Sequence, residues 1–447
     1  MRKLVLILII SFFGVLNLSA QVNYARIDKL TYDFYTDSQW DSVLHYGLMA
    51  LDADIDFLYL RMRMGIAYYE QKNFMKSSEH FKKAIEFDSS NIIAQEYLYY
   101  SYLFSGRKSD AAMRVKSLPE KLIDERNIKS RRWIETINTE SSYSQADYPF
   151  EKNNENFDAD IDIYAEGDIV NSINYYHIGL KHRPLPNLTI YHGPSYININ
   201  KSQVVYYKDQ RYEQPFSVIQ KDYYIQIKYA PFDSWEITGA FHSINVQIDR
   251  MTVDSIDFEN DVPVFVPFQR RVDSNYLIFG SISKQLGLFK PIVSYSFGHL
   301  NSHTQHQPSI GVLYYPKGNL DLYAQTSFTY FIQNGFTQMK SIIFEQTAGA
   351  KVFKNLWAEV KYSLGDRSNY AHTAGFVLDN KNKQISTTLQ AKVIWQITNE
   401  LGFMLIMNES QYTDEYRQYQ SPEKDGYLFI NYNFKVRSLL GSLNFKF

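Results

Sequence analysis

The chain of 447 residues contains no cysteine. This absence excludes disulfide bonds, thiolate metal sites, a cysteine nucleophile and a lipid-modified amino-terminal cysteine. Stability must therefore come from packing and strand pairing. The chain also lacks a large net charge of either sign, because 46 Lys and Arg residues balance 48 Asp and Glu residues. Without a basic run, no nucleic-acid partner is expected.

Long apolar runs are absent beyond residue 20. The one strong run follows Met1-Arg2-Lys3 and extends from Leu4 to about Val15, before the small residues Ser19-Ala20. Its roughly 12 residues fall short of the roughly 20 that a membrane-spanning helix needs. The segment predicts a signal peptide at residues 1–20, cleaved after Ala20, with an uncleaved anchor helix as the alternative. Export without a later membrane helix leaves the periplasm, the outer membrane or the outside of the cell.

Aromatic residues are abundant instead. The chain has 37 Tyr and 30 Phe but 5 Trp, and its mean hydropathy is mildly polar. This combination suits a barrel with alternating faces better than a bundle of membrane helices. The length allows two or more domains, at roughly 100–200 residues per domain.

Residues 24–125 have the apolar rhythm of helices and contain a repeat period of 34 residues. The unit is clearest at 58–91, where small residues allow two antiparallel helices to approach while aromatic residues fill the groove between them. Shifts of 34 residues place related side chains in weaker flanking copies. The residues expected to pack the repeats are Trp40, Ala50, Gly65, Tyr68, Phe74, Phe81, Ala84, Tyr102 and Ala111.

This pattern resembles tetratricopeptide repeats, in about three copies within a domain at residues 21–126. Two departures are clear: Ser89 stands where the family usually has Pro, and only the middle copy carries the Gly. The resemblance implies a concave face that docks a protein or peptide. A capped helical spacer that packs on a barrel mouth is the alternative, because three repeats are near the minimum for a continuous core.

From about residue 131 the apolar rhythm changes to the two-residue period of strands. The clearest segment is 320–332, and 356–364 and 389–397 repeat its pattern of one apolar and one polar face. Such segments run to about 10–13 residues, whereas strands of soluble sandwiches commonly have about 5–6. The pattern predicts a transmembrane antiparallel β-barrel at residues 127–447, with its apolar face toward lipid and its other face wet.

Connections between the expected strands alternate in length, as in outer-membrane barrels with short periplasmic turns and longer external loops. Short turns are expected near 184–187, 232–234, 286–288, 316–318, 354–355 and 398–400. Long polar segments are expected near 144–169, 201–218, 249–272, 366–384 and 413–426. The alternation gives about 14 strands, within a range of about 12 to 16, and returns the carboxy terminus to the periplasm. The range reflects 370–385, which can hold another hairpin, and 427–447, which can form one strand or two.

The sequence ends in an alternating segment with a terminal aromatic residue, Leu443-Asn444-Phe445-Lys446-Phe447. Its apolar positions, Leu443, Phe445 and Phe447, resemble the terminal signal by which outer-membrane barrels are recognised for insertion. Together the segments resemble the tetratricopeptide-plus-barrel outer-membrane proteins, YaiO-like in architecture, of Gram-negative bacteria of the Bacteroidota type. The resemblance implies outer-membrane lipid and the barrel-assembly machinery as partners, and a periplasmic helical domain.

No pattern points firmly to chemistry. The densest histidine group, His299, His303 and His306, falls where a short external loop is expected and lacks a nearby acidic residue. His242-Ser243 and Asp366-Arg367-Ser368 form a hydrolase arrangement only if folding brings them together. Phosphate-binding glycine loops and the metalloprotease helix motif are absent from the sequence. No catalytic residue, cofactor or metal is therefore expected.

These features favour a non-enzymatic outer-membrane barrel that acts as a channel or as the membrane part of an export or envelope-assembly system. Its helical repeats would dock a periplasmic protein. A membrane-anchored periplasmic scaffold without transport is the alternative. An outer-membrane enzyme that acts on lipid or glycan is a further alternative.

Overall fold

The chain divides into two compact units, Met1–Asn127 and Ile128–Phe447. The computed structural model describes residues 23–147, 164–207, 210–257, 260, 262–267, 270–335, 338–378, 384–419 and 427–447. The expected signal peptide lies outside these residues. Within them, no helix has both the length and the apolar character required to cross a membrane.

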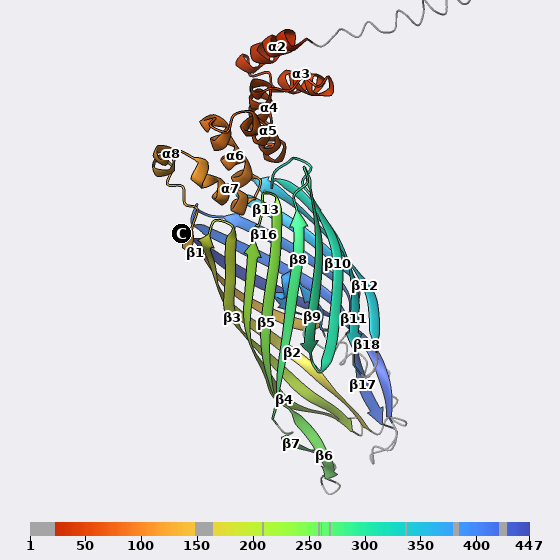
Figure 1. Cartoon of the computed structure of the whole chain (residues 1–447). Coiled ribbons are helices and arrows are strands. Elements are labelled where there is room, and N and C mark those ends of the chain that lie inside the picture. The colour runs from red at the N-terminus through yellow and green to blue at the C-terminus, as the bar shows by residue number, and fades with distance from the viewer. Residues whose placement is uncertain are drawn as a thin grey trace, which may run out of the picture. The chain divides into compact units, whose positions relative to one another are not determined.

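The first unit is helical (Figure 1). Its elements are α2 (Tyr24–Thr36), α3 (Trp40–Asp52), α4 (Leu58–Glu70), α5 (Phe74–Phe87), α6 (Ile92–Phe104), α7 (Lys108–Arg114), the 3-10 helix η1 (Val115–Ser117) and α8 (Glu120–Glu125). Three helices begin after an Asn whose side chain accepts a hydrogen bond from a first-turn amide: Asn23 before α2, Asn73 before α5 and Asn91 before α6. From α2 to α7, each helix packs against the next one along the chain.

The residues expected to pack the repeats lie between these helices. A Cβ atom on Gly65 would lie 2.9 Å from Cζ of Phe81, so the absence of a side chain lets α4 approach the ring on α5. Ser77 on α5 donates a hydrogen bond to the Gly65 carbonyl at 2.9 Å. Of the remaining expected residues, Trp40 and Phe74 are half-buried, and the following are buried: Ala50, Tyr68, Phe81, Ala84, Tyr102 and Ala111. That these helices form tetratricopeptide repeats stays a prediction.

The second unit contains a closed antiparallel barrel of fourteen strands, a number inside the expected range (Figure 1). The barrel strands are β1 (Arg132–Asp147), β2 (Tyr164–Leu185), β3 (Leu188–Tyr207), β4 (Gln210–Tyr229), β5 (Trp235–Asp249), β8 (Arg271–Lys284), β9 (Phe289–Leu300), β10 (His303–Tyr314), β11 (Leu322–Asn334), β12 (Met339–Phe353), β13 (Leu356–Arg367), β16 (Gln384–Gln396), β17 (Leu401–Tyr419) and β18 (Tyr427–Lys446). Residues 427–446 therefore form one strand. Pairing of β1 with β18, in register from Thr136↔Lys446 to Asp147↔Lys435, closes the ring.

Two further hairpins lie outside the barrel ladder. β6 (Met251–Asp257) pairs with β7 (Val262–Pro267) in the connection from β5 to β8. β14 (Ala371–His372) pairs with β15 (Val377–Leu378) across the 3-10 turn η4 (Thr373–Gly375). The segment 370–385 thus holds a hairpin, but this hairpin adds no strand to the barrel.

The two ends of the barrel differ in their connections. Short links at 186–187, 230–234, 285–288, 315–321, 354–355 and 397–400 lie at one end, together with the first residue of β1 and the last residue of β18. We call this the turn end, and the opposite end the loop end. The expected short turns are confirmed, and each lies at the turn end. The long segment expected near 201–218 is wrong, because β3 continues to Tyr207, β4 begins at Gln210, and the polar residues there pair within the sheet.

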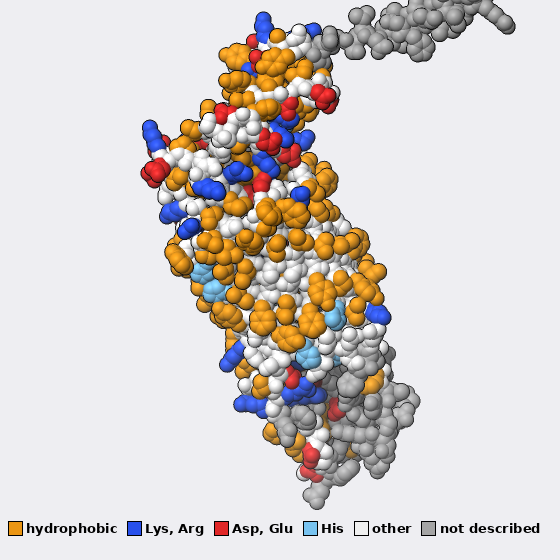
Figure 2. Space-filling view, viewed as in Figure 1, with side chains coloured by type: hydrophobic (Ala, Val, Ile, Leu, Met, Phe, Trp, Pro, Cys, Tyr) orange, Lys and Arg blue, Asp and Glu red, His pale blue; other side chains and the backbone are white. Residues whose placement is uncertain are grey.

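The outer wall is apolar because alternate residues of each strand face outward. Figure 2 shows a band of hydrophobic side chains on the barrel, with charged side chains beyond it. Large side chains exposed on this wall include Ile178, Tyr223, Ile227, Phe241, Ile278, Val293, Ile310, Phe328, Ile342, Val360, Leu389 and Met407. An exposed apolar belt on a closed barrel, which leaves no unpaired strand edge, is the arrangement that lipid requires.

The inner face of the barrel wall is not polar along its whole length, so the expectation of a wet inner face is only partly correct. On β5 the inward residues Glu236 and Thr238 are polar near the turn end, whereas Ile244 and Val246 are apolar and buried toward the loop end. Burial of apolar side chains inside the ring provides packing there, as in a water-soluble core. Alternation shows that two faces differ, but it does not show that one face changes character along its length.

The carboxy-terminal aromatic residues lie at the turn end. Leu443 and Phe445 are 39% and 42% exposed, as outward residues of β18 are, and Phe447 follows the strand. The backbone amide of Phe447 donates to the Glu135 carbonyl at 3.2 Å. Recognition of this segment by the barrel-assembly machinery stays a prediction.

One buried histidine connects two helices of the first unit. Arg61 on α4 donates to Nδ1 of His80 on α5 at 3.3 Å, and His80 stacks on Tyr68 with ring centroids 5.3 Å apart. Accepting this bond requires neutral Nδ1. Burial and then the Arg61 charge disfavour the imidazolium and lower the pKa of His80 from 6.5 to about 4.

The helical unit should therefore lose stability in mild acid. The folded pKa is depressed, so the contribution of neutral His80 is complete above pH 6.5 and is lost as the pH falls from 6.5 toward 4. With each pKa unit equal to about 1.4 kcal/mol, we expect a loss of about 2 kcal/mol between pH 7.5 and 5. Urea unfolding of the full chain in detergent, followed at 222 nm, measures it. H80Q should show a weaker pH dependence than the wild type and than H45Q; equal slopes in all three would contradict the assignment.

Candidate functional site

The connection from β13 to β16 folds into the barrel instead of remaining at the loop end. Its described part, residues 368–378, carries the β14–β15 hairpin, and we call it the inner loop. The reversal is sharp because Asn369, Thr373, Ala374 and Gly375 all have positive φ, with 78° at Gly375. Glycine adopts this conformation at little cost. A Cβ on Gly375 would lie 2.2 Å from Cδ2 of Leu277 on β8, so the turn presses closely against the inner wall.

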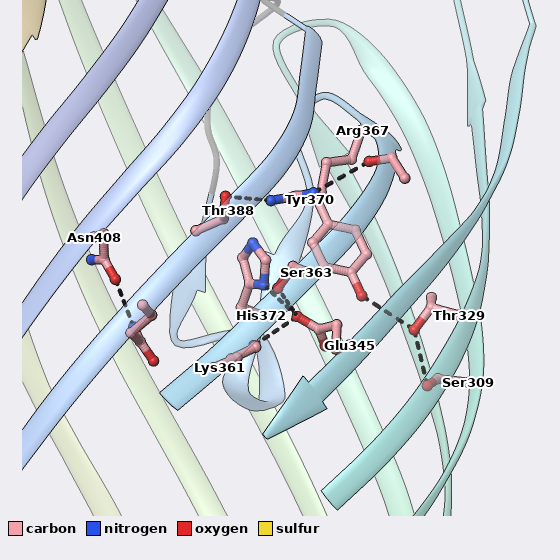
Figure 3. Close-up of polar contacts among 12 residues, drawn as sticks. Ser309, Thr329, Glu345, Lys361, Ser363, Arg367, Tyr370, His372, Thr388 and Asn408 are labelled. Atoms are coloured by element: carbon pink, nitrogen blue, oxygen red, sulfur yellow. Dashed lines mark hydrogen bonds and ion pairs between the residues drawn. The ribbon is translucent and has the colours of Figure 1, made fainter. Parts of the chain in front are cut away.

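One side of the inner loop is held by hydrogen bonds to β11 and to the β9–β10 turn. The Tyr370 hydroxyl donates to Oγ1 of Thr329 at 3.1 Å, and Thr329 donates to Ser309 on β10 at 3.0 Å (Figure 3). The Asn369 amide donates to Gln333 at 3.1 Å and accepts from Asn301 at 2.6 Å. The loop is thus fixed to β11, which Thr329 in turn links to β10, and to the β9–β10 turn.

Glu345 on β12 gathers three partners beneath this side. Lys361 forms an ion pair with Oε1 of Glu345 at 2.6 Å, and His372 of the inner loop and Ser363 each lie 3.2 Å from the same oxygen (Figure 3). The His372 ring also packs edge-on against Tyr370, with centroids 4.5 Å apart. A buried carboxylate needs such partners, because an unpaired one is costly in a low-dielectric interior.

Arg367 marks the point where β13 becomes the inner loop. Its side chain is fully buried, and Nη2 donates to Oγ1 of Thr388 on β16 at 2.6 Å while Nη1 donates to the Gly365 carbonyl at 3.2 Å (Figure 3). The guanidinium therefore fastens the base of the loop to the next barrel strand.

The tip of the inner loop reaches strands on another part of the ring. The Tyr224 hydroxyl on β4 donates to the Ala374 carbonyl at 3.0 Å, and Nδ1 of His242 on β5 donates to the Gly375 carbonyl at 2.8 Å. The Phe376 ring lies 5.0 Å from the rings of His177 and Tyr224. Since β4 and β12 are separated by five strands in the ring order, the loop spans the lumen.

His242 also faces a carboxylate. Its Nε2 lies 3.6 Å from Oδ2 of Asp222 on β4, and both side chains are 4% exposed. Oδ2 accepts from the Gln220 amide at 2.9 Å, whereas Oδ1 has no partner among the described residues. Of these residues, His242 contacts the inner loop directly, through its hydrogen bond to the Gly375 carbonyl.

A polar cavity of about 230 Å³ lies on the turn side of the inner loop. Hydroxyl groups dominate its wall, from Ser281, Ser283, Ser294, Ser296, Ser309 and Ser327. Lys228, Glu236 and Lys290 line it nearer the turn end, and residues 370–374 of the inner loop also line it. Lys290 Nζ lies 3.4 Å from Glu236 Oε1, so charges of both signs are present.

Apolar packing occupies the lumen nearer the loop end. Ala165, Ile169, Val204 and Tyr206 of β2 and β3 cluster with Ile385, Tyr412, Tyr432 and Phe434 of β16, β17 and β18. The tips of β17 and β2 also pair directly, from Arg417↔Glu166 to Tyr419↔Tyr164, although β18 and β1 lie between them in the ring. This pairing narrows the rim of the barrel at its loop end. The described lumen is therefore obstructed twice, by the inner loop and by this cluster.

The sequence-derived candidates for chemistry lie apart from one another. The short external loop expected at the histidine group is a two-residue turn at 301–302, and the three histidines lie on the strands that flank it, His299 on β9 and His303 and His306 on β10. The described residues contain no group of three side chains placed to hold a metal ion. His242 faces the lumen, but Ser243 follows it on the outward side of β5. Ser368 accepts from the Gln333 amide at 3.2 Å rather than contacting a histidine.

Comparison with known proteins finds similar solved structures but no family. No protein-family model and no curated protein matches the sequence. Similar solved structures include a FadL homologue from Pseudomonas aeruginosa, at 8% identity and TM-score 0.42 over 70% of this chain and 90% of that chain. The toluene transporter TodX from P. putida has 5% identity and TM-score 0.43 over the same shares. A bacterial polysaccharide outer membrane secretin has 11% identity and TM-score 0.36 over 71% and 99%.

The inner loop should be immobilised by its aromatic tip. Because the chain has no cysteine, V377C gives a single site for a spin label on a residue that is 47% exposed. We expect a slow label in the otherwise native protein and a faster one after F376A, which removes the ring contacts with His177 and Tyr224. Electron paramagnetic resonance line shapes measure the change. F241A, at a lipid-facing neighbour of His242, should leave the spectrum unaltered; a mobile label in the native protein would contradict the docked loop.

Proposed function

We propose that the protein is an outer-membrane channel for small polar solutes that is closed at rest by its inner loop. The observation that carries this proposal is the hydroxyl-lined cavity, whose boundary on one side is the inner loop rather than the barrel wall. Rings of polar residues inside a barrel of this size suit passage of hydrated molecules. The loop is held by side-chain contacts and not by barrel ladder pairing, so it can move without opening the wall.

The topology supports a periplasmic position for the turn end. Barrels in the outer membrane have short periplasmic turns and longer external loops. Here the six links at the turn end have two to seven residues, whereas the loop end carries the longer connections from β1 to β2, from β5 to β8 and from β13 to β16, beside short ones such as the two-residue β9–β10 turn. β1 begins at that end and follows the helical unit by four residues, 128–131. The helical unit then lies in the periplasm, and the cavity lies on the periplasmic side of the inner loop.

The helical unit is proposed to dock a periplasmic protein. Tyr59 on α4 and Ile93 on α6 are 34 residues apart, one repeat length, and are 62% and 56% exposed. Large apolar side chains at equivalent exposed positions of successive repeats are suited to contact with another protein. This arrangement also fits the membrane component of an export or envelope-assembly system, in which the partner would act on the closed channel.

Conductance across planar lipid bilayers tests the channel. The wild type should be closed most of the time, and F376A combined with H372A should raise the open probability at least about tenfold, as a loss of about 1.4 kcal/mol from the closed state does. Adding F434A, in the apolar cluster near the loop end, should raise it further. F241A is the control for an aromatic ring lost from the lipid-facing wall. Folded variants that remain silent even in combination would favour the anchored scaffold without transport.

Site-specific photo-cross-linking in cells tests docking. A photoreactive residue at Tyr59 or at Ile93 should give the same discrete adduct, because one partner covers both positions. The matched control is Leu48 on α3, which is 46% exposed and is not related to them by the repeat. Adducts that are absent at both positions, or identical at all three, would count against a docking face on α4 and α6.

A further inference from the structure

A groove of about 480 Å³ lies on the outer wall, on the far side of the strands from the lumen. Its apolar lining comes from Tyr143 on β1, Leu389 and Ala391 on β16, Met407 on β17 and Leu439 on β18. Tyr143, Leu389, Met407 and Leu439 are each about half exposed, at 48–54%. These are outward positions of their strands, so the groove faces the surrounding lipid rather than the cavity inside.

A charged cluster borders the groove on its loop side. Glu409 accepts from Lys435 Nζ at 2.7 Å and from Arg437 Nε at 2.9 Å. Glu409 and Arg437 also line the groove, and the side chains of Lys435 and Arg437 are 50% and 63% exposed. Two cations therefore share one carboxylate beside an apolar slot.

The cluster lies where the apolar belt ends. On β18 the outward residues from the turn end are Phe445, Leu443, Gly441 and Leu439, followed by Arg437 and Lys435. Arg437 precedes Phe445 by eight positions on β18. In a strand tilted by about 40°, this offset corresponds to roughly 20 Å along the membrane normal. The apolar belt of outer-membrane barrels is about 25 Å tall, so the backbone of Arg437 lies near the loop-side edge of the belt, from which its long side chain can reach the lipid headgroups.

The outward residues next to the groove, on its turn side, are small. Gly441 on β18 pairs with Ser141 on β1, and both occupy outward positions. A Cβ on Gly441 would meet no atom closer than Cε2 of Phe403, at 4.0 Å. The small residues at these two positions leave room beside the wall on the turn side of the groove, in the direction in which an acyl chain runs.

We propose that this surface binds a lipid of the loop-side leaflet that carries a phosphate on its headgroup. The phosphate contacts Lys435 and Arg437, and one acyl chain lies in the groove between Leu389, Met407 and Leu439. Guanidinium and ammonium groups are the preferred donors to phosphate, and cations at this depth attract anionic lipids. Glu409 orients the two cations in the absence of lipid and competes with the phosphate. This site is independent of the channel, because none of its residues lines the cavity.

Native mass spectrometry of the full chain in detergent tests the site with three probes. Phosphatidic acid supplies phosphate and acyl chains, diacylglycerol supplies the chains alone, and glycerol 3-phosphate supplies the headgroup alone. We expect retention of phosphatidic acid well above diacylglycerol and no retention of glycerol 3-phosphate. Equal retention of phosphatidic acid and diacylglycerol would show nonspecific lipid and would overturn the proposal, as would retention of glycerol 3-phosphate alone.

Substitutions locate the binding. K435Q with R437Q should lower the affinity for phosphatidic acid by about tenfold or more, since two charge-assisted contacts are lost. E409Q should raise it, because the competing carboxylate is gone. R211Q is the matched control, since Arg211 forms a similar ion pair with Glu213 at 2.8 Å on β4, away from the groove. An unchanged affinity in the double variant, or a fall in E409Q as large as in the double variant, would overturn the assignment.

Discussion

The closed ladder of backbone hydrogen bonds is the constraint on which the rest of the barrel depends. In lipid, an unpaired strand edge costs several kcal/mol per exposed group, so pairing of β1 with β18 is what makes an apolar outer wall admissible. Closure then fixes the direction of every side chain, because alternate residues must face lipid or lumen. The apolar exterior and the polar cavity both follow from this single geometric condition.

Closure of the barrel encloses a lumen, and different side chains occupy the half near the turn end and the half near the loop end. Near the turn end, serine and glutamine side chains bound a cavity; near the loop end, tyrosine, phenylalanine and aliphatic side chains pack as in a soluble core. The inner loop lies at the change between the two. It uses both kinds of contact, with Tyr370 and His372 in polar contacts on one side and Phe376 among aromatic rings on the other.

The strand number, the short links at the turn end and the outward residues could be predicted, because each depends on local period and turn residues. The lengths of the connections at the loop end were predicted less well, since the polar residues near 201–218 belong to β3 and β4. The inner loop could not be predicted. Gly375-Phe376-Val377-Leu378 is visibly strand-like within a polar segment, but only tertiary contacts with β4 and β5 show that it turns inward. The short link near residue 300 was expected, but not its length: the connection is two residues long, so the histidines around it belong to β9 and β10. The groove residues belong to four strands, two of them joined only by closure, so no sequence spacing relates them.

The inner loop and the apolar cluster near the loop end are held in the lumen by different interactions, and they differ in how easily they can be displaced. The apolar cluster near the loop end is reinforced by backbone pairing between β17 and β2, so disturbing it means breaking part of a ladder. The backbone hydrogen bonds of the inner loop's hairpin are formed within the loop, which contacts the barrel wall through individual side chains. Each hydrogen bond that such a side chain forms contributes about 1 kcal/mol net. A ligand that enters the cavity reaches Tyr370 and His372 before it reaches the apolar cluster. In the proposed channel, opening would therefore begin at the inner loop and on the turn side, and the apolar cluster would separate only after the loop has left the lumen.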